Sequence, residues 1–210
     1  AAILSEEDLE AFDYVDLGKL LSAVPGVYVR GEDGFGLRPN IGIRGAAAER
    51  SQKLTLMKDG VLITPAPYSA PAAYYVPNIS RIAAVEVLKG PAAIRYGPHT
   101  VGGAINFLSP TIPEETTTRV DLSAGSYGFK KLQLSTGGRT GSGGYFIDAL
   151  NYSSDGFKEL DGGGNTGFER TDLGAKFQFI PKSSDREQVL SLTLDIGSER
   201  ANETYLGLTD

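Results

Sequence analysis

The sequence predicts an α+β domain, a small mixed sheet with short helices, followed by antiparallel strands of either a soluble β-sandwich or a transmembrane β-barrel. Three observations lead to this prediction. Short helix and strand signals are mixed as far as Pro113, alternating apolar and polar residues follow from Thr116, and 27 of the 210 residues are glycine. High glycine content is typical of chains with many turns and much β structure.

The composition excludes several classes of protein. The formal net charge is −6 and the lysines and arginines form no basic run, which argues against a nucleic-acid partner. The chain has no cysteine, so disulfides and thiolate metal sites are excluded. No apolar run reaches the roughly 18 residues that a transmembrane helix needs. The N-terminal AAILSEEDLEAF has neither the basic nor the apolar region of a signal peptide.

The first 113 residues carry helix, strand and turn signals. Ser5 followed by Asp8 resembles a capping box before EEDLEAF, and Asp16 precedes a second short helix, LGKLLSAV, which Pro25-Gly26 should stop. The strand candidates are VYVR, NIGIRG, KLTLMKDGVLI with a hairpin turn at its Asp-Gly, and AAVEVLKG. The proline-rich segment 64–78 is expected to be an exposed loop.

The remainder of the chain shows a period of two. The strand candidates are TTTRVDLSAGS, KKLQLST, GYFIDALNYS, TDLGAKFQFI and VLSLTLDIG, joined by polar segments such as GGRTGSGG. In TDLGAKFQFI, Leu173 and Phe177 lie on one face, and Asp172 and Lys176 lie on the other. A soluble β-sandwich has the same alternation. Strands of about 9–11 residues, joined by alternately short and long connections, favour a transmembrane barrel.

A turn-rich block, VEVLKGPAAIRYGPHTVGGAINF from Val85 to Phe107, completes an ordered set of motifs. Before it come Pro25-Gly26-Val27, Ile43-Arg44-Gly45 and Asp59-Gly60. Each motif alone is weak evidence, but their order over about a hundred residues is specific. Together they resemble the plug domain of TonB-dependent outer-membrane receptors.

This resemblance implies a plug domain at residues 1–113 inside a 22-stranded antiparallel barrel, with about the first five barrel strands at 114–210. Within the family, the chain is most similar to ferric dicitrate receptors, on PAPYSAP, IRYGPHTVGGAINF and ETYLGLTD. It departs from them at His99, where a glutamine is expected, and at Lys89, where the family usually has arginine.

The resemblance also implies a function. The chain would belong to a receptor in the bacterial outer membrane that binds a ferric citrate-like siderophore and imports it to the periplasm. The implied partners are TonB of the inner-membrane energy-transducing complex, the iron chelate as transported ligand, and outer-membrane lipid and lipopolysaccharide. No intrinsic cofactor and no nucleic acid are expected. An enzyme is not expected either, because the sequence has no nucleophile elbow, HExxH or P-loop.

The candidate site residues fall into two groups. An anionic chelate is recognised by arginine and by hydroxyl and amide donors, and the expected apical plug loops supply Arg50, Gln52, Thr64, Tyr68, His99 and Thr100. Since His99 is the only histidine, direct metal ligation is not expected. By resemblance, Arg44 and Lys89 are partly buried cations paired with barrel-wall carboxylates, and Glu86 is the nearest carboxylate within the plug.

Two alternatives stay open at this point. The same architecture could import another siderophore, haem, a corrinoid or another metal chelate. A soluble periplasmic binding or signalling module with a β-sandwich tail is the alternative from a different class. Because a barrel of 22 strands needs at least roughly 220 residues in the membrane, we expect further strands beyond Asp210 in a longer receptor.

Overall fold

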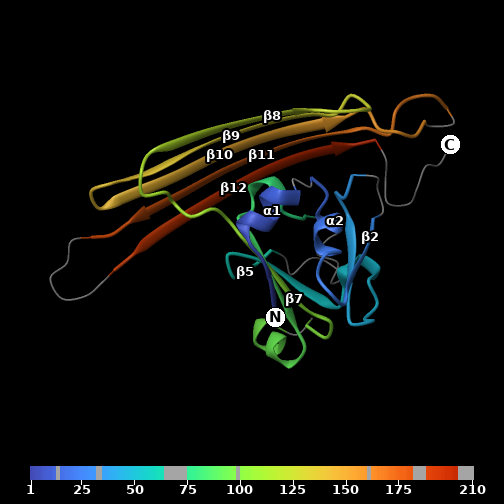
Figure 1. Ribbon diagram of the computed structural model, residues 1–210, viewed down its shortest axis with the longest axis horizontal. Helices are drawn as coiled ribbons and strands as arrows, with labels where there is room; N and C mark the ends of the chain where they lie inside the picture. Colours follow the sequence, from blue (N-terminus) through green and yellow to red (C-terminus); the bar gives the residue numbers. More distant parts are fainter. Residues whose placement is uncertain are drawn as a thin grey trace. The chain divides into compact units, whose positions relative to one another are not determined.

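The structure is a computed structural model that describes residues 1–12, 15–31, 35–63, 75–97, 100–159, 162–181 and 188–202. The chain divides into two compact units, unit 1 at Ala1–Pro110 and unit 2 at Thr111–Asp210 (Figure 1). Each unit has its own sheet, and the two are described separately.

Unit 1 is built around a mixed sheet in the order β1-β6-β7-β4-β5. The strands are β1 (Ala2–Leu4), β4 (Leu54–Lys58), β5 (Val61–Leu62), β6 (Ala84–Lys89) and β7 (Gly103–Leu108). β4 and β7 run parallel, and the other neighbours are antiparallel. A separate hairpin pairs β2 (Val27–Gly31) with β3 (Pro39–Ile43). The strand segments predicted from the sequence of this unit are therefore confirmed.

Both predicted helix starts are confirmed. Ser5 and Asp8 bond reciprocally before α1 (Glu6–Phe12): the Ser5 backbone N–H donates to the Asp8 carboxylate at 2.9 Å, and the Asp8 N–H donates to Ser5 Oγ at 3.3 Å. The first of these bonds holds the pKa of Asp8 below its ordinary value. Asp16 caps α2 (Leu17–Leu21) by accepting from the Gly18 N–H at 2.7 Å. Within the described residues, no helix is long and apolar enough to cross a membrane.

The core of unit 1 is apolar and closed. Ile105 and Phe107 of β7 and Ile41 and Ile43 of β3 have no exposed surface, and α2 adds its buried leucines to the same cluster. The expectation of an exposed loop at 64–78 is wrong at its end, because Val76 joins this cluster and is buried. Residues 64–74 of that loop lie outside the described residues.

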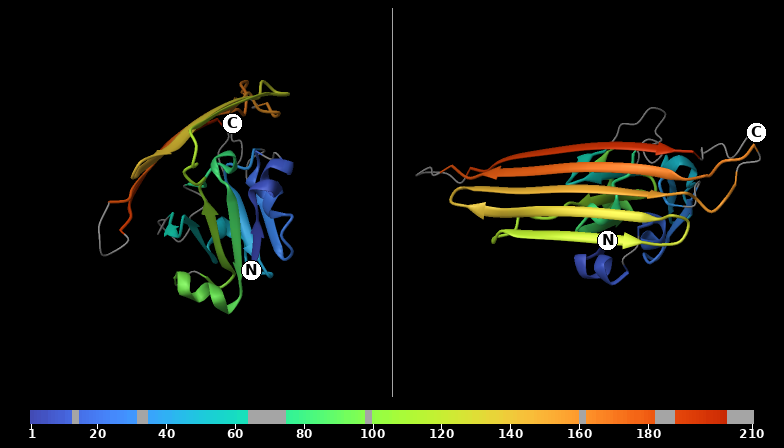
Figure 2. Two further views of the ribbon diagram at one scale, coloured as in Figure 1. Left: turned by 60° about the vertical axis from the view of Figure 1, so that its left-hand side comes forward. Right: turned by 90° about the horizontal axis from the view of Figure 1, so that it is seen from above.

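Unit 2 is a five-stranded antiparallel sheet in sequential order, β8 to β12 (Figure 2). The strands are β8 (Thr117–Ala124), β9 (Lys130–Thr140), β10 (Gly143–Ser154), β11 (Phe168–Phe179) and β12 (Leu190–Ala201). The predicted alternation of short and long connections holds only in part. Residues 125–129, 141–142 and 155–167 follow it, but the next connection, 180–189, is long where a short one is expected.

The glycine segment GGRTGSGG is mostly strand, although its composition predicts a turn. β9 continues through Gly137 and Gly138, and β10 begins at Gly143, so only residues 141–142 form the turn. The glycines make room for neighbours. A Cβ on Gly137 would lie 2.9 Å from Pro113, and one on Gly144 would lie 3.0 Å from Ile112. The segment before β8 therefore packs closely on these strands.

Candidate functional site

The predicted ligand loops of unit 1 meet at one end of its sheet, here called the loop end. β4 and β7 are parallel and begin there, with Leu54 opposite Gly103, while β6 ends there at Lys89. The Gly102 N–H donates to the Lys53 carbonyl at 2.8 Å, and a Cβ on Gly102 would lie 3.3 Å from Ala46. Segments 44–53 and 89–102 are therefore neighbours, although 36 or more residues separate them in the sequence.

The third predicted loop follows β5 in the sequence. β5 is antiparallel to β4, so Val61 and Leu62 run back toward the loop end. Thr64 and Tyr68 of this loop lie outside the described residues, as does His99. Their assignment to the ligand site stays a prediction.

Arg50 lies in a strained turn. This turn, η1 (Glu49–Ser51), has two consecutive residues in the left-handed region, Arg50 at φ 50° and Ser51 at φ 53°. The Arg50 N–H donates to the Asn40 side-chain oxygen, and the Ile41 N–H donates to Ser51 Oγ at 3.0 Å. Two hydrogen bonds to β3 therefore fix the backbone that carries Arg50.

Gln52 and Thr100 both lie at the loop end, but they form different hydrogen bonds. Gln52 is half-buried and caps η1, and its backbone N–H donates to the Glu49 carbonyl. The Thr100 hydroxyl donates to the Gly97 carbonyl at 2.9 Å. Because its one proton closes this turn, the Thr100 hydroxyl can only accept from a ligand unless that bond breaks.

Three of the sequence motifs converge at a corner of the loop end. Lys89 Nζ donates to the Pro25 carbonyl at 2.6 Å, and the Arg44 N–H donates to the Gly26 carbonyl at 2.8 Å. A Cβ on Gly90, whose φ is +83°, would lie 2.8 Å from Arg44 Nη1. The Pro-Gly-Val, Ile-Arg-Gly and Lys-Gly-Pro turns therefore form one corner, held by two cationic residues.

Glu86 is not the partner of these cations within unit 1. Its carboxylate accepts from the Asn106 side-chain amide at 2.9 Å, and the oxygen of the same amide accepts from the Gly60 N–H at 2.9 Å. Alternation along β6 places Glu86 and Lys89 on opposite faces of the strand. Arg44 is exposed and Lys89 is half-buried, so pairing of these cations with a barrel wall stays a prediction.

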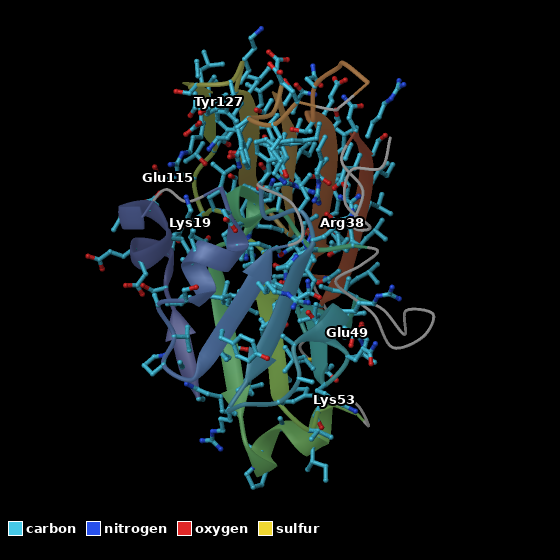
Figure 3. The ribbon with its side chains drawn as sticks, turned by 90° about the vertical axis from the view of Figure 1, so that its right-hand side faces the viewer. Lys19, Arg38, Glu49, Lys53, Glu115 and Tyr127 are labelled. Carbon is cyan, nitrogen blue, oxygen red and sulfur yellow. The ribbon has the colours of Figure 1, made fainter. Side chains whose placement is uncertain are left out.

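Charge is distributed unevenly over unit 1. Segments 44–53 and 89–102 contain five cationic residues, Arg44, Arg50, Lys53, Lys89 and Arg95, and a single carboxylate, Glu49. The opposite end of the sheet has the acidic first turn of α1, which follows β1 directly, and Asp59 in the turn after β4. Figure 3 shows Glu49, the first residue of η1, and Lys53, which follows η1, on one flank of the unit.

The sheet of unit 2 presents an apolar face that is not covered. Leu173, Phe177 and Leu192 are 48%, 41% and 52% exposed. The register aligns this face in rows across the strands, such as Ile196–Leu173–Ala149–Leu134–Val120. A face this apolar and this large is suited to contact with lipid, and it is unlike the closed core of a soluble sandwich.

The opposite face of this sheet is mostly polar, although Leu150 and Tyr152 are buried on it, and it carries buried ion pairs. Arg170 Nε donates to Asp172 at 2.8 Å and Arg170 Nη1 donates to Glu199 at 3.4 Å, which joins β11 to β12. Lys131 and Asp121 join β9 to β8 at 3.4 Å. The two faces therefore have the chemistry of a barrel wall, with lipid on one side and a polar lumen on the other.

Comparison with known proteins gives the family. Residues 1–104 match the model of the TonB-dependent Receptor Plug Domain. The chain belongs to the TonB-dependent receptors. Vitamin B12 transporter BtuB of Photobacterium profundum is 29% identical over 157 residues, 74% of this chain and 25% of that protein. The chain thus spans about a quarter of the length of this relative.

Solved structures share the fold of this TonB-dependent receptor chain. The unliganded ferric citrate transporter FecA matches with a TM-score of 0.75 at 22% identity, over 95% of this chain and 31% of its own. The ferric enterobactin receptor PfeA matches with a TM-score of 0.72 at 19% identity, over 95% and 33%. The predicted fold class, a mixed-sheet plug with the start of an antiparallel barrel, is confirmed. The total of 22 strands stays a prediction.

Family membership also bears on location and chemistry. It places this TonB-dependent receptor in the outer membrane, as predicted. The relatives are named as transporters and receptors, which agrees with the prediction that the protein is not an enzyme. The soluble-module alternative is disfavoured by the same comparisons and by the uncovered apolar face of unit 2.

Sequence reasoning missed several residues that shape the plug site. Asn40 and Ser51 hold the Arg50 turn, and Asn106 joins β6 to the Asp-Gly turn. One signal was present: asparagine is depleted in strands, yet Asn40 and Asn106 lie within apolar strand segments. An asparagine in such a place is expected to have a specific hydrogen-bonding role.

Proposed function

We propose that the complete receptor binds an anionic iron chelate of the ferric citrate type at the cell surface. It then passes the chelate to the periplasm with energy from TonB. The observation that supports this ligand class is the excess of cationic residues at the loop end of the plug. Contact of the apolar face of unit 2 with outer-membrane lipid belongs to the same proposal.

The cations of the loop end are well suited to an anionic ligand. Lys89 contacts a neutral carbonyl at 2.6 Å and Arg95 lies 5.3 Å from the centroid of the Tyr96 ring, so these contacts leave both charges uncompensated. A concave surface lined by charge of one sign raises the local concentration of the opposite ion. Direct hydrogen bonds from such groups to carboxylates contribute about 1.5–3 kcal/mol each.

A corrinoid is the second candidate ligand. The curated relative at 29% identity is named a vitamin B12 transporter, which favours this ligand class. Cyanocobalamin is neutral overall, however, and its binding would draw little benefit from the five cationic residues of the two loops.

The test is equilibrium binding to the complete receptor in detergent, with ferric citrate, a ferric hydroxamate and cyanocobalamin as probes. We expect saturable binding of ferric citrate that weakens as salt is raised, because salt screens exposed charges. Arg95→Gln should weaken it, whereas Lys58→Gln, at the opposite end of the sheet, should not. Saturable binding of cyanocobalamin together with no binding of ferric citrate would overturn the proposal in favour of the corrinoid.

A further inference from the structure

We propose that Asn40 and Ser51 are positioning residues for ligand recognition. They hold the turn Glu49–Ser51 in a strained form that presents the Arg50 guanidinium and the Gln52 amide to the anionic ligand. This inference rests on the proposed function for the identity of the ligand, and it adds two buried residues that do not touch the ligand themselves.

The backbone conformation of this turn is energetically unfavourable for residues other than glycine. Arg50 has φ 50° and ψ 24°, and Ser51 follows with φ 53°. Residues other than glycine rarely adopt this region, and two in succession are rarer still. Such strain persists only where surrounding contacts over-determine it, and it gathers at functional sites.

Two buried polar side chains supply those contacts. Asn40 is 1% exposed, and its amide oxygen accepts from the Arg50 N–H while its amide nitrogen donates to the Arg30 carbonyl at 3.3 Å. Ser51 has no exposed surface, and its hydroxyl donates to the Pro39 carbonyl at 3.2 Å while it accepts from the Ile41 N–H at 3.0 Å. The turn is therefore bonded to the β2–β3 hairpin at two points.

The choice of residues in the turn points to a role for the Arg50 side chain. Arg44 and Asp59 of unit 1 are also left-handed, but each is followed by a left-handed glycine, Gly45 or Gly60, where glycine removes the steric cost. Arg50 is followed by Ser51 instead, so this turn has two left-handed residues and no glycine. The bond to Asn40 uses only the backbone N–H of Arg50, so this bond does not require the guanidinium.

A double-mutant cycle in the complete receptor tests the inference, with ferric citrate as the probe. Arg50→Ala should weaken binding by about tenfold or more, the scale expected for loss of a charged hydrogen bond. Asn40→Ala should weaken binding by about tenfold. If Asn40 acts through Arg50, Asn40→Ala should have no further effect in the Arg50→Ala background.

Asn78 provides a matched control. It is also a buried asparagine, 5% exposed, and its side-chain oxygen accepts from the Ser80 N–H at 2.8 Å, but it lies before β6 at the opposite end of the sheet. Asn78→Ala should leave the affinity for ferric citrate within about twofold of wild type, while it lowers stability as Asn40→Ala does. Equal loss of affinity in both variants, or additive losses in the cycle, would overturn the positioning role.

Hydrogen exchange separates failure of this inference from failure of the proposed function, because it needs no ligand. The Arg50 amide should exchange faster in Asn40→Ala and the Ile41 amide faster in Ser51→Ala, with neither changed in Asn78→Ala. If the wild-type receptor does not bind ferric citrate, the proposed function fails. The exchange rates of the Arg50 and Ile41 amides still show whether Asn40 and Ser51 hold the turn. Unchanged exchange of the Arg50 amide in Asn40→Ala would overturn the inference whatever the ligand.

Discussion

Both units alternate apolar and polar residues along their strands, but they put the apolar residues in opposite places. In unit 1, Ile105 and Phe107 point into a closed core and have no exposed surface. In unit 2, Leu173 and Leu192 lie on a face that is about half exposed. The same period of two therefore describes a closed core in one case and an exposed apolar face in the other. Whether such a strand forms part of a core or an exposed face depends on which other elements pack against it and on the solvent around it.

The polar residues differ in the same way. In unit 1 the neutral side chains of Asn40 and Asn106, which lie in strands, accept hydrogen bonds from the backbone N–H groups of turns. Unit 2 uses charged side chains, with Arg170 between Asp172 and Glu199, to bond one strand to the next. The ion pairs of unit 2 join neighbouring strands and so favour the observed register.

The largest expected effect concerns the two kinds of apolar residue. Phe107→Ala should destabilise unit 1 by about 3–5 kcal/mol, because it leaves a cavity in a closed core. Leu192→Ala should cost less than about 1.5 kcal/mol, since a half-exposed side chain leaves no cavity. Denaturant unfolding of the complete receptor, followed by probes in each unit, measures both. Similar losses of stability at the two positions would contradict the assignment of Phe107 to a closed core and Leu192 to an exposed face.

A charge on the apolar face of unit 2 should lower the stability nearly as much. Leu173→Lys should destabilise the barrel in lipid by about 2–4 kcal/mol, the cost of a lysine near the bilayer midplane. Gln133→Lys is the control, because Gln133 is opposite Asp121 on the polar face, where a cation can pair with a carboxylate. Refolding equilibria in lipid vesicles would measure the difference. Equal tolerance of the two lysines would mean that water covers both faces.

The corner formed by the three turns of unit 1 should give a smaller effect. Gly90→Ala should cost about 1–3 kcal/mol, because a backbone at φ +83° and ψ −158° is adopted almost only by glycine. Gly45→Ala, at φ +78° with nothing within 4 Å, should cost about 1 kcal/mol for its backbone. Thermal unfolding of the complete receptor would measure both losses of stability. No loss of stability in Gly90→Ala would contradict the strain assigned to this turn.

The smallest effect is on the cap of α1. The pKa of Asp8 lies below its ordinary value of 3.8 because its carboxylate accepts hydrogen bonds from Ser5, first from the backbone N–H. The stabilisation is therefore complete above about pH 4 and is lost as the pH falls through the lowered pKa. Amides of α1 should exchange faster in acid in wild type, and Asp8→Asn should abolish this pH dependence. A dependence that persists in Asp8→Asn would refute the assignment.

Much of the fold follows from local signals in the sequence. Capping at Ser5 and Asp16, the Asp-Gly hairpin turn, and the alternating strands of unit 2 all depend on neighbours a few residues apart. The strands through Gly137 and Gly144 were not predictable in this way. Glycine is present there because Pro113 and Ile112, which are distant in sequence, pack against these strands. The residues next to each glycine in the sequence do not indicate that contact.

The site was predictable to the level of its loops and no further. The resemblance predicted Arg50, Gln52 and Thr100 as ligand residues of apical loops. The structure brings the segments that carry them together at the loop end, and their role in ligand binding stays a prediction. Glu86 was assigned to the cations although strand alternation separates it from Lys89, and its bond to Asn106 spans 20 residues. Asn40 was missed because its bond to Arg50 forms only when the hairpin folds back on the turn.

The most direct test of the central claim, that unit 2 is a membrane wall with one lipid-facing side, is a spin-label scan of β11 in the complete receptor. This chain has no cysteine, so in a receptor whose other cysteines, where present, are replaced, single cysteines for labelling can be introduced one at a time from Thr171 to Phe179. Labels at Leu173, Ala175 and Phe177 should be accessible to oxygen dissolved in lipid, and labels at Gly174, Lys176 and Gln178 to a water-soluble nickel chelate. Uniform access of the nickel chelate along the strand would contradict the account.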